Sequence, residues 1–319
     1  MHIPDGFIDG RTAALAAALS ATGLGLALRQ VRRELAPKRM PLLGLAAAFL
    51  FAAQMINFPV AGGTSGHLTG AVLVAALLGP APAVVVLSTV LIVQCFLFAD
   101  GGVLALGANI FNMALVAAIS GHAIYRCVWR LLPGTSGRLA ALAFAAWCST
   151  VLASIACAGE LAFSGTVTWS AAFPAMAGLH MLIGLGEGCI SALVFATILR
   201  TRPDLAAQDL SMRSDGNRRR RAGYGLLVAL GLAVFVTPLA SSLPDGLETV
   251  ATRLGFEHRA APPLVSAPAA DYRISAVKSP AATTAAAGVI GTLAAFGLAL
   301  LLGRTLAARG ADPVAPPRR

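Results

Sequence analysis

The sequence predicts an all-α integral membrane protein with about nine transmembrane helices. Of its 319 residues, 57% are hydrophobic and 12% are charged, against roughly 25% charged residues in ordinary soluble domains. The mean hydropathy is +0.77. So little polar surface cannot cover a water-facing globule, and the apolar excess must face lipid. This composition excludes a cytosolic enzyme, a disordered chain and a secreted disulfide scaffold.

Nine apolar segments approach the length of about 20 residues that a helix needs to cross a bilayer. They cover residues 12–28, 41–59, 67–79, 81–98, 103–125, 139–163, 171–199, 223–241 and 284–303. The third segment is short, and the sequence GPAP at 79–82 separates it from the fourth, which predicts a bend or a partly re-entrant element.

A polar stretch divides the first seven segments from the last two. We therefore expect a seven-helix unit over residues 1–200, a cytoplasmic basic linker over 201–222 and a two-helix unit over 223–319. Pro and Ala are frequent in residues 242–283, which are expected to form a mostly irregular external loop.

Basic residues gather in four clusters between the apolar segments. The clusters surround Arg32, Arg130 and the run at 218–221, and the last lies at 304–319. Positive loops mark the cytoplasmic face of a plasma-membrane protein, so we expect an extracytoplasmic N-terminus and a cytoplasmic C-terminus. The net charge of +10 does not indicate nucleic acid, because no aromatic interleaving or nucleic-acid motif accompanies the basic run.

The N-terminus is expected to remain in the mature protein. Residues 1–10 lack a basic start and contain Asp5 and Asp9, unlike a cleavable signal peptide. The bulky His2 also favours retention of Met1.

No nucleotide site is expected on this chain. Its only lysines are Lys38 and Lys278, and neither follows a Gly-x-x-x-x-Gly pattern.

The main ionisable residues inside apolar segments are Glu160, His180 and Glu187, and the last two lie two turns apart on one helix face. We favour packing or subunit contacts for them. The alternative is a proton relay in a self-sufficient metal/proton carrier or channel. A membrane enzyme is the third possibility, but no acid pair or nucleophile and base has convincing spacing.

The first two residues offer three nitrogen donors to one metal ion. They are the Met1 amine, the His2 backbone amide and the His2 imidazole, which close a five-membered and then a six-membered chelate ring. His67, in a Gly-rich loop expected on the same outer face, offers the fourth. A planar four-nitrogen set suits Ni(II) or Cu(II) and is poor for zinc, magnesium or calcium. Without further evidence, a histidine at position 2 is more often a solvated surface residue, and a lone histidine in a Gly-rich loop is more often structural.

Three amide side chains are expected to hold the threaded N-terminus near this site. Gln54 and Asn57 lie one helical turn apart before the Gly-rich loop, and Asn109 lies on a neighbouring segment. The alternative for all three is hydrogen bonding between helices.

Five motifs resemble one transporter family over roughly residues 1–200. They are MHIPDGF at 1–7, QMINFP at 54–59, GGTSGH at 62–67, GANIFNM at 107–113 and HMLIG at 180–184. The residues of these motifs and the order of the motifs resemble CbiM/NikM, the cobalt and nickel substrate-binding membrane subunit of energy-coupling factor (ECF) transporters. The resemblance implies Ni2+ or Co2+ as transported substrate, with Met1, His2 and His67 as metal ligands. It also implies separate ATPase subunits and a transmembrane coupling (T) protein as partners.

Residues 222–319 are similar to the accessory subunit CbiN/NikN, which has two spans and an outer loop. The sequence PDGLE at 244–248 resembles the signature of the nickel version, so we favour nickel over cobalt, although both metals accept nitrogen ligands. The alternative is that Asp245 and Glu248 cap the start of a helix.

Overall fold

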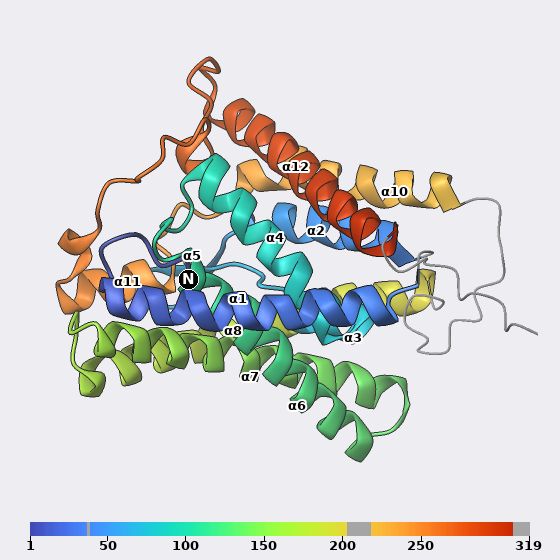
Figure 1. The fold of residues 1–319 in the computed structure, drawn as a ribbon, viewed down its shortest axis with the longest axis horizontal. Coiled ribbons are helices and arrows are strands. Elements are labelled where there is room, and N and C mark those ends of the chain that lie inside the picture. Colours follow the sequence, from blue (N-terminus) through green and yellow to red (C-terminus); the bar gives the residue numbers. More distant parts are fainter. Residues whose placement is uncertain (37–38, 203–217, 309–319) are drawn as a thin grey trace, which may run out of the picture.

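Each of the nine apolar segments contains helix in the computed structural model, which describes residues 1–36, 39–202 and 218–308. The helices are α1 (Gly10–Glu34), α2 (Met40–Gln54), α3 (Ala71–Leu78), α4 (Pro80–Phe98), α5 (Leu106–Ile110), α6 (Ala117–Leu131), α7 (Gly134–Phe163), α8 (Trp169–Thr201), α10 (Arg218–Gly231) and α12 (Pro280–Ala308) (Figure 1). A π-helical turn at Phe111–Val116 joins α5 to α6. Within the described ranges, seven helical stretches are long and apolar enough to cross a membrane. The prediction of an all-α membrane protein is confirmed.

The second apolar segment ends in a β-hairpin and not in helix. Helix α2 stops at Gln54, and β1 (Phe58–Val60) pairs antiparallel with β2 (Thr64–Gly66), with Phe58 opposite Gly66. Pro59 cannot donate the backbone hydrogen bond that a continuing helix would need. The predicted segment 41–59 is therefore too long by five residues, and Asn57 lies beyond the helix that carries Gln54.

The third segment forms the short element that its length predicted. Helix α3 has eight residues, which span about 12 Å. Gly79 separates it from α4, which begins directly at Pro80. Residues 67–70 lead from the hairpin to α3 as non-helical chain, and His67 is the first of them.

Helices of the second half of the chain pack on those of the first half. Helix α12 lies along α2, and α10 packs on the same helix. A Cβ atom at Gly291 of α12 would overlap the Phe51 ring of α2. A small residue at this point lets two membrane helices approach closely.

The segment between α10 and α12 is more ordered than the predicted irregular loop. It contains α11 (Gly246–Leu254) and short 3-10 turns at Glu257–Arg259 and Ala270–Tyr272. The side chain of Asp245 accepts from the Glu248 amide, and the Glu248 side chain accepts from the Asp245 amide. This reciprocal capping stabilises the start of α11, as the capping interpretation predicted.

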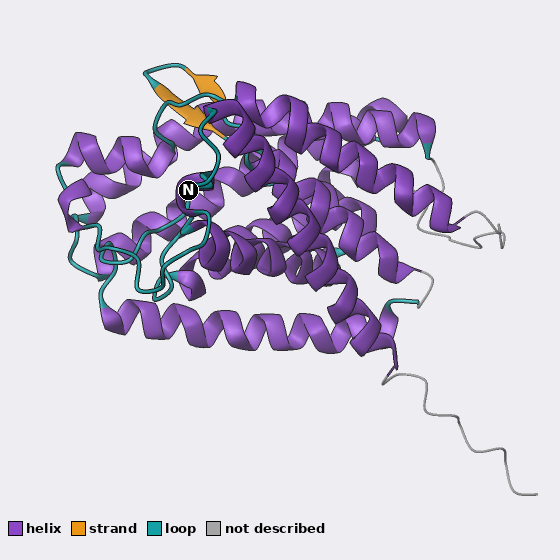
Figure 2. Cartoon of the chain, turned by 90° about the horizontal axis from the view of Figure 1, so that it is seen from above, coloured by secondary structure: helices purple, strands orange, loops and turns teal. Residues whose placement is uncertain are grey.

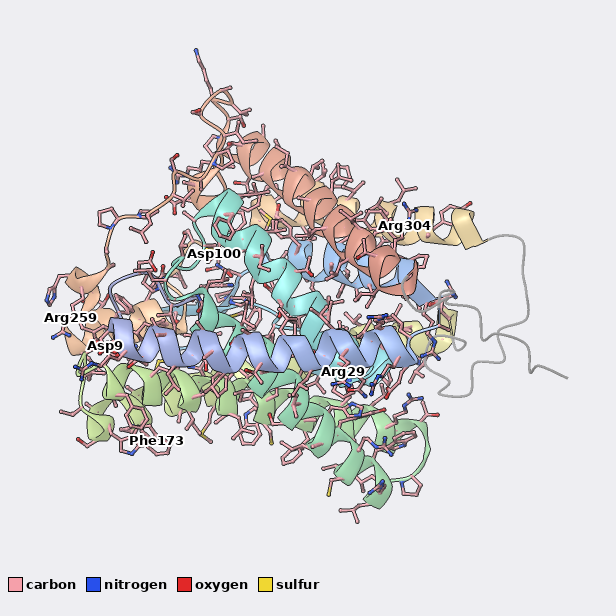
Figure 3. All side chains as sticks on the ribbon, viewed as in Figure 1. Asp9, Arg29, Asp100, Phe173, Arg259 and Arg304 are labelled. Atoms are coloured by element: carbon pink, nitrogen blue, oxygen red, sulfur yellow. The ribbon has the colours of Figure 1, made fainter. Side chains whose placement is uncertain are left out.

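Charged residues lie at both ends of the helices. Arg29 and Arg304 lie at one end, and Asp9, Asp100 and Arg259 lie towards the other (Figure 3). Most loops also gather at the second end (Figure 2). Most of the predicted linker 201–222, Lys38 and the tail after residue 308 lie outside the described residues, as do the side chains at 218–221.

Candidate metal centre

The first residues of the chain are threaded into the protein. The exposed fraction is 9% for Met1 and 0% for Ile3. The side chain of Asn109 forms hydrogen bonds with both polar backbone groups of Ile3. Its Oδ1 accepts from the Ile3 amide at 2.7 Å, and its Nδ2 donates to the Ile3 carbonyl at 3.1 Å. Asn109 therefore contacts the N-terminal segment, and its predicted role beside a metal stays a prediction.

Asp5 fixes the same segment a second time. Its carboxylate accepts three backbone N–H groups just before α5, from Val103, Leu104 and Ala105, at 3.1, 2.9 and 3.2 Å. A Cβ atom at Gly102 would overlap this carboxylate. Only glycine therefore leaves room for the segment to pass so close to the backbone.

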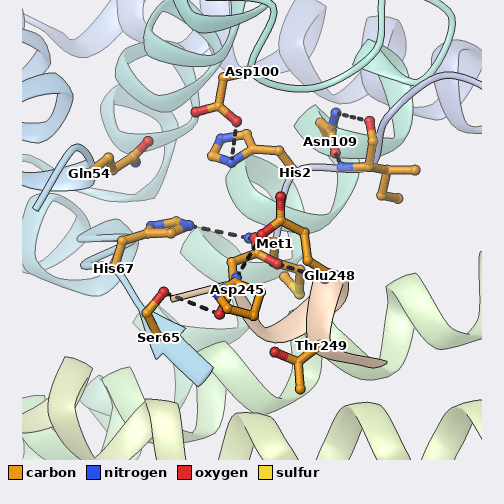
Figure 4. A network of polar contacts seen from close by, with 12 residues as sticks. Met1, His2, Gln54, Ser65, His67, Asp100, Asn109, Asp245, Glu248 and Thr249 are labelled. Carbon is orange, nitrogen blue, oxygen red and sulfur yellow. Dashed lines mark hydrogen bonds and ion pairs between the residues drawn. The ribbon is translucent and has the colours of Figure 1, made fainter. Parts of the chain in front are cut away.

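Met1, His2 and His67 come together as the sequence predicted. The Met1 amine lies 3.3 Å from His67 Nε2. The His2 and His67 rings are stacked, with centroids 5.4 Å apart and planes inclined by 25°. Figure 4 shows the three residues converging with Asp245 and Asp100 beside them. Within the described ranges, no three His, Cys, Asp or Glu side chains are placed to hold a metal, so a metal site here depends on the terminal amine and the backbone amide.

Asp245 holds the amine of Met1. Its Oδ2 lies 2.5 Å from the amine nitrogen. Burial lowers the pKa of the amine, but the combined attraction of Asp245, Asp100 and Glu248 outweighs burial, so this pKa is raised. Burial and the nearby amine lower the pKa of His67 well below its usual value, and burial lowers the pKa of His2 against the pull of Asp100. These lowered pKa values favour the neutral imidazole, which is the form that binds a metal.

The second half of the chain brings Asp245 to this position. Ser65 of β2 donates to the Leu243 carbonyl from its hydroxyl at 2.7 Å and to the Pro244 carbonyl from its amide at 2.8 Å. In α11, the Thr249 hydroxyl donates to the Thr64 hydroxyl at 2.9 Å. The sequence identified Asp245 through its motif and did not predict its contact with the amine.

Two residues that the sequence analysis missed contact the His2 ring. The ring lies with Nδ1 3.1 Å from Asp100 Oδ1 and Nε2 3.2 Å from Gln94 Oε1. The signal for Gln94 was available, since it is a polar residue in the apolar segment 81–98. Asp100 follows the same segment, and the Tyr272 hydroxyl donates to its Oδ2 at 2.5 Å.

Gln54 and Asn57 are placed differently from Asn109. Gln54 Nε2 donates to the Thr69 carbonyl at 3.1 Å, and its Oε1 accepts from Gln94 Nε2 at 2.9 Å. Gln54 therefore contacts the turn after His67 and not the N-terminal segment itself. The backbone carbonyl of Asn57 accepts from the Ser241 amide at 2.8 Å. Its predicted role beside the metal stays a prediction.

The three ionisable residues that the sequence places inside apolar segments each have a partner of their own. Glu160 accepts from Asn112 Nδ2 at 2.6 Å, and His180 Nδ1 lies 2.8 Å from the Met176 carbonyl. Glu187 accepts from the backbone amides of Thr69 and Gly70 at 2.7 and 2.8 Å. In the part of the chain that the structure describes, no hydrogen bond joins these three side chains into one track. Glu187 instead anchors the turn that follows His67.

Comparisons with known proteins match both parts of the chain. Residues 2–205 match the CbiM family, described as the cobalt uptake substrate-specific transmembrane region, and residues 219–308 match the PDGLE domain. A putative fused nickel transport protein NikMN of Archaeoglobus fulgidus is 36% identical over 95% of this chain and 98% of its own length. The fused nickel transport protein NikMN of Rhodobacter capsulatus is 33% identical over 72% of this chain and 71% of its own.

Solved structures also resemble the first part of the chain. One, described as a truncated transition metal transporter, has a TM-score of 0.58 and 34% sequence identity, and the match covers 63% of this chain and 99% of that one. The family match covers well over half of the sequence, and His2, His67 and Asn109 lie within it. The chain therefore belongs to the CbiM family of cobalt uptake transmembrane regions, and a PDGLE domain follows that region.

Proposed function

We propose that this chain is the substrate-binding membrane component of an ECF-type importer of transition metal ions, with nickel as the first substrate and cobalt as the second. The metal is captured by the Met1 amine, the His2 amide and imidazole, and the His67 imidazole. The observation that carries this proposal is the distance of 3.3 Å between the Met1 amine and His67 Nε2. Met1 and His67 are 66 positions apart in the sequence, and their nitrogens lie together in a buried site.

This distance is close to what one metal ion requires. Two nitrogens bound at right angles to an ion, each at about 2.0 Å, lie about 2.8 Å apart. The Met1 amine must leave its ion pair with Asp245 before it becomes a ligand, because a protonated amine has no lone pair. The names of the two fused relatives support nickel, the family description supports cobalt, and an all-nitrogen donor set is compatible with both.

The rest of the chain fits a capture subunit that depends on partners. Residues 1–200 form the metal-binding unit, 201–222 the cytoplasmic linker and 223–319 the accessory unit with its external loop at 242–283. The position of Arg29 and Arg304 at the end opposite the metal centre supports an extracytoplasmic N-terminus and a cytoplasmic C-terminus in the plasma membrane. Separate ATPase subunits and a T protein would supply the energy, since the sequence has no phosphate-binding loop.

Isothermal titration with nickel and cobalt tests the metal site. We expect the native chain to bind, and a chain with one Ala placed before Met1 to lose at least about tenfold in affinity, equivalent to 1.4 kcal/mol. The extension moves the amine out of the five-membered ring. A chain with one Ala added after Arg319 is the matched control. Equal affinity in the native and N-terminally extended chains would exclude the terminal amine as a ligand.

Reconstitution in vesicles tests the need for partners. The chain alone, without a metal gradient, should accumulate no nickel, and addition of ATPase subunits and a T protein with ATP should start uptake. Uphill uptake by the chain alone, driven by a proton gradient, would favour the carrier interpretation instead.

A further inference from the structure

A chain of side-chain amides runs from the turn after His67 to the ring of His2. It begins at the Thr69 carbonyl, passes through Gln54 and Gln94, and ends at His2 Nε2, with nitrogen–oxygen distances of 3.1, 2.9 and 3.2 Å. Gln54 and Gln94 are both buried, at 4% and 0% exposure. Water therefore does not offer these groups an alternative partner.

We propose that Gln54 and Gln94 are positioning residues that fix the tautomer of His2, keeping its proton on Nε2 and leaving Nδ1 as the nitrogen presented to the metal. This inference rests on the proposed function, because it concerns how one of the proposed ligands is prepared.

The first carbonyl in the chain sets the direction of every hydrogen bond. A backbone carbonyl only accepts, so Gln54 must turn its NH2 group towards Thr69. Its oxygen then faces Gln94 and accepts from the Gln94 NH2 group. The oxygen of Gln94 is left for His2, and it accepts only from a protonated Nε2. Reversing either amide would bring two oxygens together in a buried place, which costs about 1–3 kcal/mol for each unsatisfied group.

The position of the proton decides whether His2 can chelate. A six-membered ring closes through the His2 amide nitrogen, Cα, Cβ, Cγ, Nδ1 and the metal. Nε2 lies on the far side of the imidazole and cannot close this ring. A neutral imidazole has one N–H and one lone pair, so a proton on Nε2 is the condition for a free Nδ1. Hydrogen bonding at the other ring nitrogen is the usual means of fixing the tautomer of a metal-binding histidine.

Asp100 makes this control necessary. Its Oδ1 lies 3.1 Å from Nδ1, and a carboxylate at that distance favours a proton on Nδ1, where it would block the metal. The two sides of the ring therefore compete for the proton of the neutral imidazole. The amide chain favours the chelating tautomer, while Asp100 favours the blocked one.

Nitrogen NMR of the metal-free protein, with 15N-labelled histidine, tests the inference directly. The full-length chain with its native N-terminus is used, and the spectrum of His2→Ala assigns the His2 signals. We expect protonated Nε2 and unprotonated Nδ1 in the native chain. In Gln94→Leu, where Nε2 has no acceptor, the proton should move to Nδ1. In Gln94→Glu an oxygen still faces Nε2, so the native tautomer should remain.

Nickel titration gives a second measurement on the same variants. Loss of a group that orients a metal ligand typically lowers affinity 10–100-fold, so Gln94→Leu should bind nickel about tenfold more weakly. Gln30→Leu is the matched control, because Gln30 lies exposed on α1 and contacts only Glu34 in the described hydrogen bonds. Its tautomer signals and nickel affinity should equal those of the native chain.

The possible results separate this inference from the proposed function. An unchanged His2 tautomer in a folded Gln94→Leu protein would overturn the role of Gln94, whether or not nickel binds. If the native chain binds no nickel but the tautomer shifts as expected, the proposed function fails and the control of the ring stands. Loss of the native tautomer in Gln94→Glu as well would show that Gln94 acts by packing and would also overturn the inference.

Discussion

The Met1 amine and the Asp245 carboxylate, 244 positions apart in the sequence, form an ion pair of 2.5 Å beside His67. The contact joins the first residue of the chain, directly before the CbiM region, to the first residue of the capping box of α11 in the PDGLE domain. Asp245 therefore has two simultaneous tasks, to start a helix and to hold the terminal amine.

Substitution of Asp245 by Ala should release the N-terminus and destabilise the protein. Loss of the helix cap costs about 1 kcal/mol. Removal of one partner of a fully buried ion pair costs about 3–5 kcal/mol, and the loss here should be smaller because Asp245 is 17% exposed. We expect a lower melting temperature and faster acylation of the α-amine by an amine-reactive reagent, followed by mass spectrometry. Glu257→Ala, at an exposed acidic residue after the same helix, is the control. An α-amine that reacts at the native rate in the Asp245 variant would contradict the buried ion pair.

Substitution of the two histidines should affect nickel affinity unequally. His67→Ala removes one donor, whereas His2→Ala removes a donor together with the closure of a chelate ring. We expect each to weaken binding at least about tenfold, or 1.4 kcal/mol, and His2→Ala to weaken it more, as measured by isothermal titration. His258→Ala, at an exposed histidine of the outer segment, should bind like the native chain. A greater loss in His67→Ala than in His2→Ala would argue against the chelate at the N-terminus.

Asn109→Leu should detach the N-terminal segment at Ile3. The buried Ile3 amide loses its acceptor, and an unsatisfied buried donor costs about 1–3 kcal/mol of unfolding free energy. Because Met1 and His2 precede Ile3 directly, nickel affinity should fall as well. Asn112→Leu removes a buried amide that pairs with Glu160, so it should lower stability and leave nickel affinity unchanged. If the two variants lose affinity equally, the effect of Asn109 is a general loss of stability.

Single cysteines should report the orientation in the membrane. In a variant whose five native cysteines are replaced, an impermeant maleimide added to intact cells should label Arg259→Cys and leave Arg29→Cys and Arg304→Cys unlabelled. All three side chains are exposed, so access to the reagent depends on the side of the membrane. Labelling of position 29 in sealed cells would reverse the proposed topology.

Much of the helical architecture could be predicted from the sequence, because a helix that faces lipid requires a long apolar segment. The hairpin at Phe58–Gly66 could not be predicted in this way. In the sequence, residues 58–60 resemble the end of an apolar helix, and only their pairing with β2 makes them a strand. The true end of α2 depends on that pairing. Helix α11 was foreseen only as an alternative, through the capping residues Asp245 and Glu248.

The meeting of Met1, His2 and His67 could be predicted because their donors form one chelating set and because the surrounding motifs resemble the CbiM/NikM family, which implies these residues as ligands. The contacts that surround them could not. Gln94 and Asp100 reach His2 only after α4 has packed beside the N-terminal segment, and no local pattern encodes that approach. The metal-binding role of the three residues themselves stays a prediction.

The contacts of Ser65 with Leu243 and Pro244, like the ion pair at Met1, join two regions that share one polypeptide. Covalent attachment through a short connection gives two binding surfaces an effective concentration on the order of millimolar. Individually weak hydrogen bonds are then enough to keep the PDGLE domain on the N-terminal segment. Because the contact is intramolecular, it does not depend on the concentration of the protein in the cell. The one-to-one ratio of the two regions is also fixed at translation, so no two copies of the threaded N-terminus compete for one PDGLE domain.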